Sequence, residues 1–110
     1  MQTIDTEEFK RLREEHVPVI DVLPAKMHDE KHIAGTANVP VTRDDFADAV
    51  AEQIGGSQGP VVVYCANAEC DASPKAAHKL EKAGFEQVYD YDGGTAAWEA
   101  AGGELAGAQA

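Results

Sequence analysis

The chain has 110 residues, which is enough for one domain with a modest hydrophobic core but not for two. Its net charge of −11 argues against nucleic acid and anionic membranes as partners, because both bind basic protein surfaces. No apolar run is long enough to span a bilayer, and residues 1–5 lack the basic start and apolar stretch of a signal peptide, so we expect a cytoplasmic protein.

The acidity has two interpretations that the sequence leaves open. It provides solubility, as in a host with a salty cytoplasm, or it attracts a basic partner protein. The two cysteines are too few for a disulfide scaffold, so in a reducing compartment we expect free thiols or a redox pair. Nothing in the sequence demands more than a monomer.

The first half of the chain opens with a helix pattern, and strand-like runs follow it. Asp5–Glu8 resembles a capping box and predicts a helix through about His16, with Phe9 and Leu12 on its apolar side. The next three segments are a buried strand, a loop with a short helix and a short extended piece, at residues 17–22, 24–33 and 37–40.

The second half continues the alternation of helix and strand. Thr42 and Asp45 are positioned to cap a helix that ends near Ile54, where the glycine-rich turn 55–59 begins. The continuous apolar run 60–64 predicts a strand covered on both faces. Next come a helix at residues 73–83 and a strand at 85–91. A closing helix follows at 95–101, and we expect the small polar tail 102–110 to fray. This order predicts a single α/β domain with a mainly parallel sheet.

Cys65 directly follows the 60–64 strand, and the short loop 66–72 leads from it to a helix. Ser73 and Pro74 are typical of an N-cap and a first-turn proline. Loop amides and the positive end of the helix would then face the sulfur and lower the pKa of the thiol. This layout favours nucleophilic cysteine chemistry, and the alternative is a buried structural cysteine that ends a core strand.

A second cysteine, Cys70, lies in the same loop. If the loop curls around Cys65, Cys70 is a candidate resolving thiol that attacks a persulfide or sulfenic acid on Cys65 and leaves a disulfide. The alternative is a loop cysteine exposed by chance, because spacing alone does not bring the two Cβ atoms together. A zinc site of both cysteines with His78 is disfavoured, since the cysteines lack a Cys-x-x-Cys spacing and His78 is expected on the helix flank.

Several separated motifs, taken together and in order, resemble those of rhodanese domains. Residues 19–22 and 32–40 match the front signature. Residues 62–65, with Ala76, Ala77 and Leu80, match the active-loop region. Residues 83–85 and 92–98 match the last strand and its closing helix. The match covers nearly the whole chain, and the ordered set is specific although each motif alone is weak. The resemblance implies a three-layer α/β domain, in which a central parallel five-stranded sheet has helices on both faces.

The resemblance also implies an activity centred on Cys65. In this family the cysteine accepts sulfane sulfur from a donor as a persulfide and passes it to a nucleophilic acceptor. We expect a small thiol or a thioredoxin-like protein as the acceptor, and no cofactor or metal. Backbone amides of the loop would cradle the sulfur, at Ala66, Asn67, Ala68, Glu69, Asp71, Ala72 and Ser73. Cys70 would be an optional resolving thiol.

Departures from the family pattern bear on the identity of the donor. Leu23 stands where the family often carries an arginine, and the loop holds Glu69 and Asp71 where many members have arginine or lysine. Two carboxylates near the sulfur oppose both thiolate formation and anion binding, although Lys75 and Lys79 partly offset them. We therefore expect polysulfide or a protein persulfide, rather than thiosulfate, to be the donor.

Three other functions compete with sulfur transfer. Phosphatases and arsenate reductases built on the same fold have longer loops, but residues 70–73 lack the arginine that clamps an oxyanion. A thiol redox module would cycle a disulfide between Cys65 and Cys70 without carrying sulfur. A non-catalytic interaction module is disfavoured because such modules commonly lose the cysteine.

We expect Asp21, at a strand end, to accept hydrogen bonds from loop amides, and His32 to serve packing or hydrogen bonding.

Overall fold

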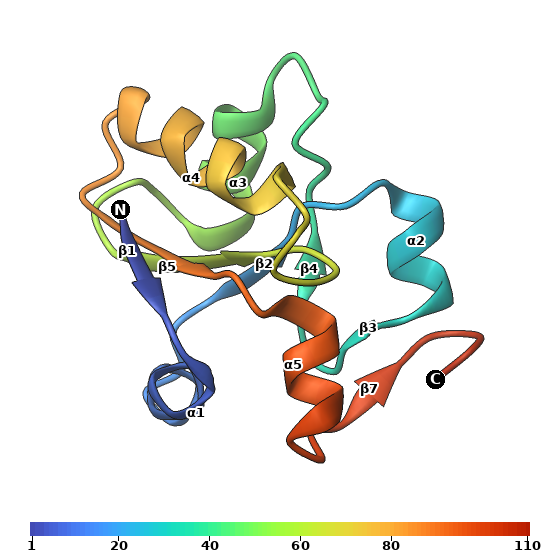
Figure 1. Ribbon diagram of the computed structural model, residues 1–110. Helices are drawn as coiled ribbons and strands as arrows, with labels where there is room; N and C mark the ends of the chain where they lie inside the picture. The colour runs from blue at the N-terminus through green and yellow to red at the C-terminus, as the bar shows by residue number, and fades with distance from the viewer.

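A parallel five-stranded sheet forms the middle layer of the computed structural model, which describes residues 1–110 (Figure 1). Its strands are β1 (Gln2–Ile4), β2 (Val19–Asp21), β4 (Ala37–Asn38), β5 (Pro60–Tyr64) and β6 (Gln87–Tyr91). The strand order is β1-β6-β5-β2-β4, so β5 lies at the centre between β6 and β2. The predicted α/β fold with a central parallel five-stranded sheet is confirmed.

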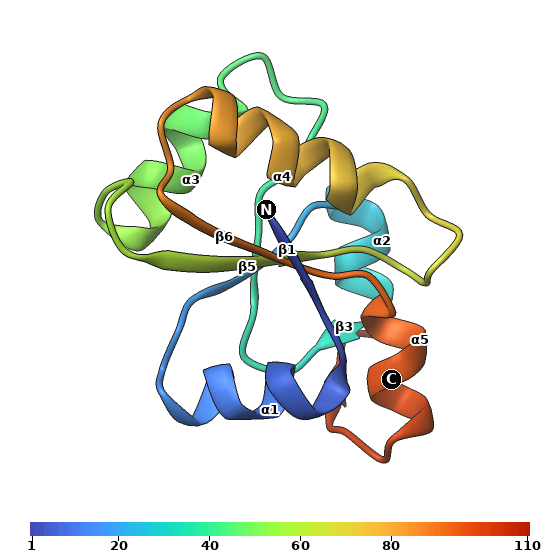
Figure 2. The same cartoon turned by 60° about the vertical axis from the view of Figure 1, so that its left-hand side comes forward.

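Helices cover both faces of this sheet (Figures 1 and 2). They are α3 (Phe46–Ile54) and α4 (Ala72–Lys82) on one face, α1 (Thr6–Glu14) and α5 (Gly94–Ala100) on the other, and α2 (Ala25–Glu30) at the end of the sheet. Val61 and Val63 of β5 join the core under α3 and α4, whereas Val62 and Tyr64 join the core on the side of α1 and α5. Because successive side chains of a strand point to opposite faces, a strand buried on both faces is continuously apolar.

The ends of α1 and α3 differ in part from the expected ones. The Asp5 carboxylate accepts a hydrogen bond from the amide of Glu8 at 2.9 Å, as the capping box predicts. The helix ends two residues before His16, which has a left-handed φ of 63°. Asp45 flanks α3, but its carboxylate binds the guanidinium of Arg43 at 2.8 and 2.9 Å instead of capping helix amides.

None of the helices is both long enough and apolar enough to cross a membrane.

The C-terminal tail is paired with the body of the protein. Strand β7 (Leu105–Ala106) runs antiparallel to β3 (His32–Ile33), and two amides beyond β7 donate to the carbonyls of Asp29 and Glu30. Leu105 also packs against the core on the side of α1 and α5. The sequence predicts a frayed tail, whereas in the structure the tail is hydrogen-bonded to β3 and to the end of α2. Local patterns did not predict this pairing, because the partners of the tail are distant in the chain.

The first turn of α5 is fastened to the end of β5. The amide of Thr95 donates to the carbonyl of Cys65 at 3.0 Å, and the amide of Ala96 donates to the carbonyl of Ala66 at 2.9 Å. Gly94 precedes them with a φ of 59°, and a Cβ atom at this position would lie 2.0 Å from the carbonyl oxygen of Cys65. A glycine is therefore required for α5 to approach the strand this closely.

We expect Gly94→Ala to lower the free energy of unfolding by about 3 kcal/mol or more, because the added Cβ meets backbone that moves only if these hydrogen bonds break. The matched control is Gly102→Ala, which also has a left-handed φ, of 81°, but nothing within 4 Å of the new Cβ. It should cost only about 1 kcal/mol of backbone strain. Chemical denaturation measures both, and equal losses would contradict the close approach of α5.

Candidate active site

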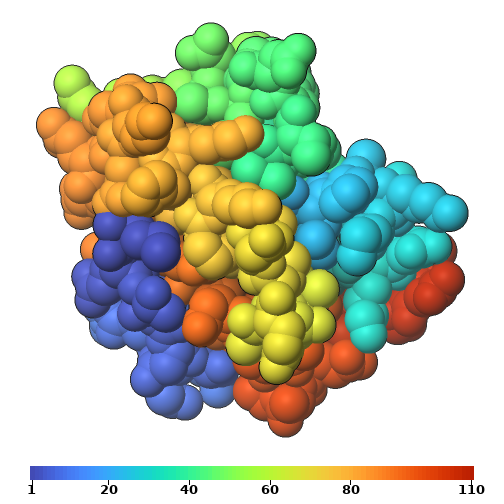
Figure 3. Space-filling model, turned by 45° about the horizontal axis from the view of Figure 1, so that its top comes forward, coloured from blue at the N-terminus to red at the C-terminus, as the bar shows by residue number.

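Cys65 follows β5 at its carboxyl end and is fully buried. Its thiol is within hydrogen-bonding distance of two oxygens, the carbonyl of Cys70 at 3.6 Å and Oγ of Ser73 at 3.5 Å. The side chain belongs to the core between the sheet and helices α3 and α4. The loop 66–71, which leads to α4, lies at the molecular surface beside α5 (Figure 3). The thiol is therefore covered from solvent in this conformation of the loop.

Asn67 fixes the conformation of the loop. Its Oδ1 accepts hydrogen bonds from the amides of Glu69 and Cys70, both at 3.1 Å, and its carbonyl accepts from the amide of Cys70, also at 3.1 Å. Such a turn is stabilised by the asparagine side chain itself. The amide of Glu69, one of those expected to cradle the sulfur, is thus bonded to Asn67 together with the amide of Cys70, and the role of the loop as a cradle stays a prediction.

The surroundings of Cys65 raise the pKa of its thiol to about 11. Burial is the largest cause, and a side-chain hydrogen bond with Cys70 adds to it, whereas the hydroxyl and the amide of Ser73 oppose it. The sequence predicts the opposite, a pKa lowered by loop amides and the helix N-terminus. That prediction was wrong because the sulfur is enclosed away from water and faces a carbonyl oxygen, and both conditions disfavour a thiolate.

The structure brings Cys70 against Cys65. Cys70 is half-buried and packs against the core cluster that contains Cys65, and both residues are free thiols. The Cys70 side chain also takes part in the hydrogen bonding that raises the pKa of Cys65. Spacing in the sequence did not establish this contact, but the folded loop does. The role of Cys70 as a resolving thiol stays a prediction.

Ser73 lies inside the first turn of α4 instead of capping it. The helix begins at Ala72, and Asp71 occupies the N-cap position without a side-chain hydrogen bond to the helix. Asp71 is exposed and forms an ion pair with Lys75 at 3.0 Å. The N-cap prediction was wrong because the helix starts at Ala72, two residues before Pro74. Pro74 still lies in the first turn, where a backbone N–H has no partner within the helix, so a proline is tolerated there. As a result Ser73 is fully buried, with its hydroxyl facing the Cys65 thiol.

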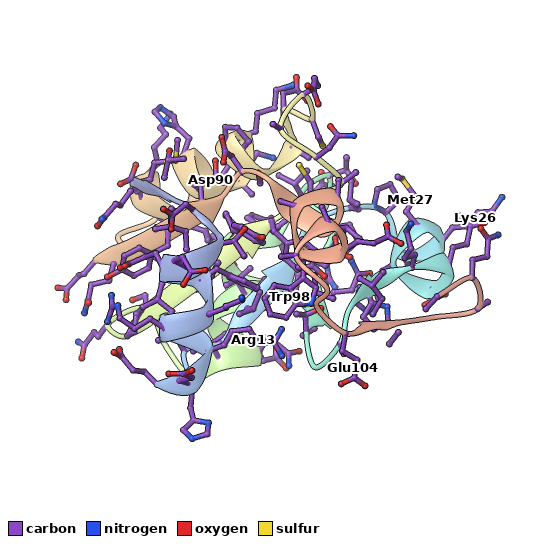
Figure 4. All side chains as sticks on the ribbon, turned by 60° about the horizontal axis from the view of Figure 1, so that its bottom comes forward. Arg13, Lys26, Met27, Asp90, Trp98 and Glu104 are labelled. Atoms are coloured by element: carbon purple, nitrogen blue, oxygen red, sulfur yellow. The ribbon has the colours of Figure 1, made fainter.

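A cavity of about 340 Å³ opens beside the loop, between the loop, α2 and α5. Ala66 and Asn67 line it on the loop side, and Thr95 lines it at the start of α5. Met27 of α2 also lines it, and its side chain is 42% exposed at the outer side of the helix (Figure 4). Ala68 is exposed on the outer surface of the loop. The cavity thus lies next to the residues that cover Cys65.

Sequence reasoning missed Asp90. This residue lies on β6 and is 1% exposed, and its Oδ1 has no hydrogen-bond partner. Burial is the main cause that raises the pKa of the Asp90 carboxyl, Asp92 adds to the rise, and a side-chain hydrogen bond with Ser73 opposes it. The signal was available in the sequence, because a charged residue stands in a segment expected to be a core strand.

Asp21 and two histidines form a separate network. The buried Asp21 carboxylate accepts from the amide of Leu23 at 2.9 Å and lies 2.8 Å from Nδ1 of His28. It does not accept hydrogen bonds from amides of the loop 66–72. The ring of His32 stacks on that of His28 at 3.7 Å, and its Nδ1 lies 2.6 Å from the His28 carbonyl. His78 is exposed, and no three His, Cys, Asp or Glu side chains are arranged to hold a metal ion.

Comparison with known proteins places the chain in a family. The model of the rhodanese-like domain matches residues 5–101. This chain belongs to the rhodanese-like family. It is 32% identical over 97 residues to the thiosulfate sulfurtransferase GlpE of Pseudomonas savastanoi pv. phaseolicola. The aligned region covers 88% of this chain and 86% of that relative. The resemblance found in the sequence motifs is confirmed.

Solved structures of similar proteins share the fold. The rhodanese-like domain of the Alr3790 protein from Anabaena sp. superimposes with a TM-score of 0.82 and 28% identity, covering 99% of this chain and 81% of that one. The BH2092 protein from Bacillus halodurans superimposes with a TM-score of 0.83 and 22% identity, covering 98% of this chain and 78% of that one, and shows the fold alone.

We expect iodoacetamide to label Cys70 much faster than Cys65 in the native protein at pH 7. A thiol with a pKa of about 11 carries roughly a hundredfold less thiolate than an ordinary cysteine, and the loop also excludes the reagent. Peptide mass mapping of a labelling time course measures both rates, and the denatured protein is the control in which they should become similar. Equal rates in the native protein would contradict a buried thiol with a raised pKa.

Proposed function

We propose that this rhodanese-like protein is a sulfurtransferase that carries sulfane sulfur as a persulfide on Cys65. The observation that supports this most directly is the position of Cys65, a thiol at the carboxyl end of the central strand, under a surface loop and beside the first turn of α4. The names of the relatives, which are thiosulfate sulfurtransferases, support the class of reaction. The proposed chemistry needs no cofactor or metal, because thiol and sulfane sulfur exchange directly.

The reaction has two halves. In the first, the Cys65 thiol loses its proton, and the thiolate attacks the outer sulfur of a donor persulfide. A new S–S bond forms on Cys65 while the S–S bond of the donor breaks, and the remaining donor sulfur leaves with the electron pair as a thiolate. In the second, an acceptor thiolate attacks the outer sulfur of the Cys65 persulfide, and Cys65 leaves as a thiolate that regains its proton.

Charge around the loop supports a donor less anionic than thiosulfate. Residues 66–73 hold no lysine or arginine, and both Glu69 and Asp71 are exposed there. The nearest basic side chain on α4, that of Lys75, is paired with Asp71. A dianion is repelled by these carboxylates more strongly than a neutral or singly charged sulfur species is. We therefore propose polysulfide or a protein persulfide as the donor.

The cavity beside the loop supports a thiol as the acceptor. Its walls include Ala66 and Asn67 on the loop, while the exposed Met27 side chain gives it an apolar rim. Glu30, Glu99 and Lys31 add charges of both signs. A small thiol fits this mixed surface, and the side chain of a cysteine presented by a thioredoxin-like protein fits it as well.

A second candidate function rests on the contact between Cys65 and Cys70. If Cys70 attacks the inner sulfur of the Cys65 persulfide, sulfide leaves with the electron pair and the two cysteines form a disulfide. A reducing thiol must then restore the pair. In a pure redox module the two cysteines would cycle in this way with an external disulfide, without a persulfide stage. We propose Cys70 as the resolving thiol of the sulfur carrier.

We expect the intact protein to gain one sulfur atom when it is exposed to inorganic polysulfide without reductant, and to gain less with thiosulfate. Intact-protein mass spectrometry measures the addition. Cys65→Ser should abolish it, because the carrier sulfur is removed. Cys70→Ser is the matched control in the same loop and should retain it, with a persulfide that lasts longer because the resolving thiol is missing.

Two outcomes would overturn this proposal. Sulfur addition that survives in Cys65→Ser would assign the chemistry to another group. A loss of two hydrogens in the unsubstituted protein, together with no sulfur gain in Cys70→Ser, would favour the redox module.

We expect Glu69→Lys to increase the rate of sulfur loading from thiosulfate by roughly 3- to 10-fold at low salt, because it replaces repulsion by attraction beside the loop. The control is Glu86→Lys, which makes the same change of net charge at an exposed position directly before β6, at the amino end of the strands and so opposite to the end where Cys65 lies. Mass spectrometry of samples quenched at successive times measures the rate of sulfur loading in both variants. A similar increase in the two variants would show that net charge, and not the loop, selects the donor.

A further inference from the structure

The segment from β7 onward, residues 105–110, is fastened to α2, and we call it the strap (Figure 1). The amides of Ala108 and Gln109 donate to the carbonyls of Asp29 and Glu30 at 2.9 and 2.8 Å. These carbonyls belong to the last turn of α2, where a helix has no partner of its own for them. The strap therefore completes the hydrogen bonding at the end of α2.

Gly107 allows the strap to come this close. Its φ is 114°, and a Cβ atom at this position would lie 2.8 Å from the carbonyl carbon and oxygen of Glu30 and 2.9 Å from the carbonyl oxygen of Asp29. All three atoms are backbone atoms, which do not turn aside as the end of a flexible side chain does. A glycine is therefore required at position 107 for the strap to reach α2.

The strap and α2 together form one wall of the cavity of about 340 Å³ beside the loop. Gln109 of the strap lines this cavity, and so do Met27 and Glu30 of α2. The two residues that directly follow the cysteine, Ala66 and Asn67, line it as well. A molecule that approaches the cysteine through this cavity therefore passes the strap.

Helix α2 contributes little to holding this wall in place by itself. It has six residues, and none of them is buried. Besides the strap, it is attached by the contact of His28 with Asp21 at 2.8 Å, and the ion pair of Lys31 with Glu99 at 3.0 Å follows the helix. This ion pair is partly exposed, so it adds little to stability. Release of the strap should thus remove one part of the wall and loosen the rest.

We propose that the strap is a wall of the acceptor site that favours small thiols over the cysteine of a protein, with Gly107 as a specificity-determining residue. This inference rests on the proposed role of Cys65 as the sulfur carrier, and it chooses between two classes of acceptor. The side chain of a cysteine is short, so the backbone of a protein acceptor must come close to the rim, where the strap and α2 stand. A small thiol carries no such surrounding surface.

The step in question is the second half of the proposed reaction. The acceptor thiolate forms an S–S bond with the outer sulfur of the Cys65 persulfide, and the S–S bond to Cys65 breaks. The electron pair of that bond stays on Cys65, which leaves as a thiolate and regains a proton from water, while the acceptor becomes a persulfide. The strap takes no part in this exchange and acts only on which acceptor enters.

The test compares glutathione with a reduced thioredoxin as acceptors. Inorganic polysulfide first loads Cys65 in a Cys70→Ser background, and intact-protein mass spectrometry then follows the loss of the added sulfur. We expect Gly107→Ala to speed transfer to thioredoxin about 3- to 10-fold, because the wall is opened. With glutathione it should raise the half-saturating concentration by about the same factor, and more than it changes the maximal rate, because binding contacts are lost.

Gly84→Ala is the matched control. Gly84 also has a left-handed φ, of 97°, but it follows α4 and has nothing within 4 Å of the new Cβ, so the preference between acceptors should stay that of the parent. Leu105→Asn releases the strap in a second way, because Leu105 packs against the core, and it should change the preference in the same direction as Gly107→Ala. Hydrogen exchange at Ala108 and Gln109 should be slow in the parent and fast in both released variants.

Binding of S-methylglutathione, which has no thiol and accepts no sulfur, keeps this test separate from the proposed function. In the unloaded parent it should shift the amide NMR signals of Ala66, Thr95 and Gln109, and it should bind more weakly to Gly107→Ala. If polysulfide adds no sulfur to Cys65, the sulfur-carrier proposal fails, while this binding still decides whether the strap forms a wall of a site for small thiols.

Any of three results would overturn the inference. The first is an acceptor preference that stays the same in Gly107→Ala and Leu105→Asn. The second is fast hydrogen exchange of the strap amides in the parent, or slow exchange that persists in Gly107→Ala. The third is S-methylglutathione that shifts none of the signals of the residues lining the cavity.

Discussion

The hydrogen bonds between the first turn of α5 and the end of β5 are the contacts on which the rest of the site depends. They hold the carbonyls of Cys65 and Ala66 and so fix the point where the chain leaves the sheet. The Cys65 side chain, in contrast, packs in the core on the side of α3 and α4. Cys65 is thus held by its backbone from one face of the sheet and enclosed by neighbouring side chains on the other.

This enclosure determines the state of the sulfur more strongly than the helix N-terminus does. Burial raises the pKa of Cys65 to about 11, and the opposing hydrogen bonds of Ser73 do not overcome it. Asn67 keeps two loop amides bonded to itself, so they are not available to the sulfur in this conformation. The proposed sulfur-carrier reaction therefore needs two events, a movement of the loop that admits the donor and the loss of the thiol proton. A site in which the thiolate is already formed needs no such proton loss.

Local patterns were sufficient to predict most of the fold, and insufficient for the inside of the site. The apolar run at β5 and the capping box at Asp5 are signals carried by adjacent residues, and both led to the correct elements. The direction of the loop amides depends instead on which atoms Asn67 binds, and the contact of Ser73 with Cys65 depends on how α4 sits over the end of β5. The pairing of β7 with β3 is similarly set by distant residues. Such contacts follow from tertiary packing and leave no mark in a short stretch of sequence.

In the proposed reaction, the carboxylates at the surface act on the approach of the sulfur donor. Glu69 and Asp71 are exposed, so water and salt weaken their effect on an approaching anion, and that effect fades beyond about 8 Å at physiological ionic strength. The Cys65 thiol is buried, so salt acts far less on its interactions with its neighbours. Added salt should therefore reduce the proposed discrimination between donors while leaving the state of the thiol almost unchanged.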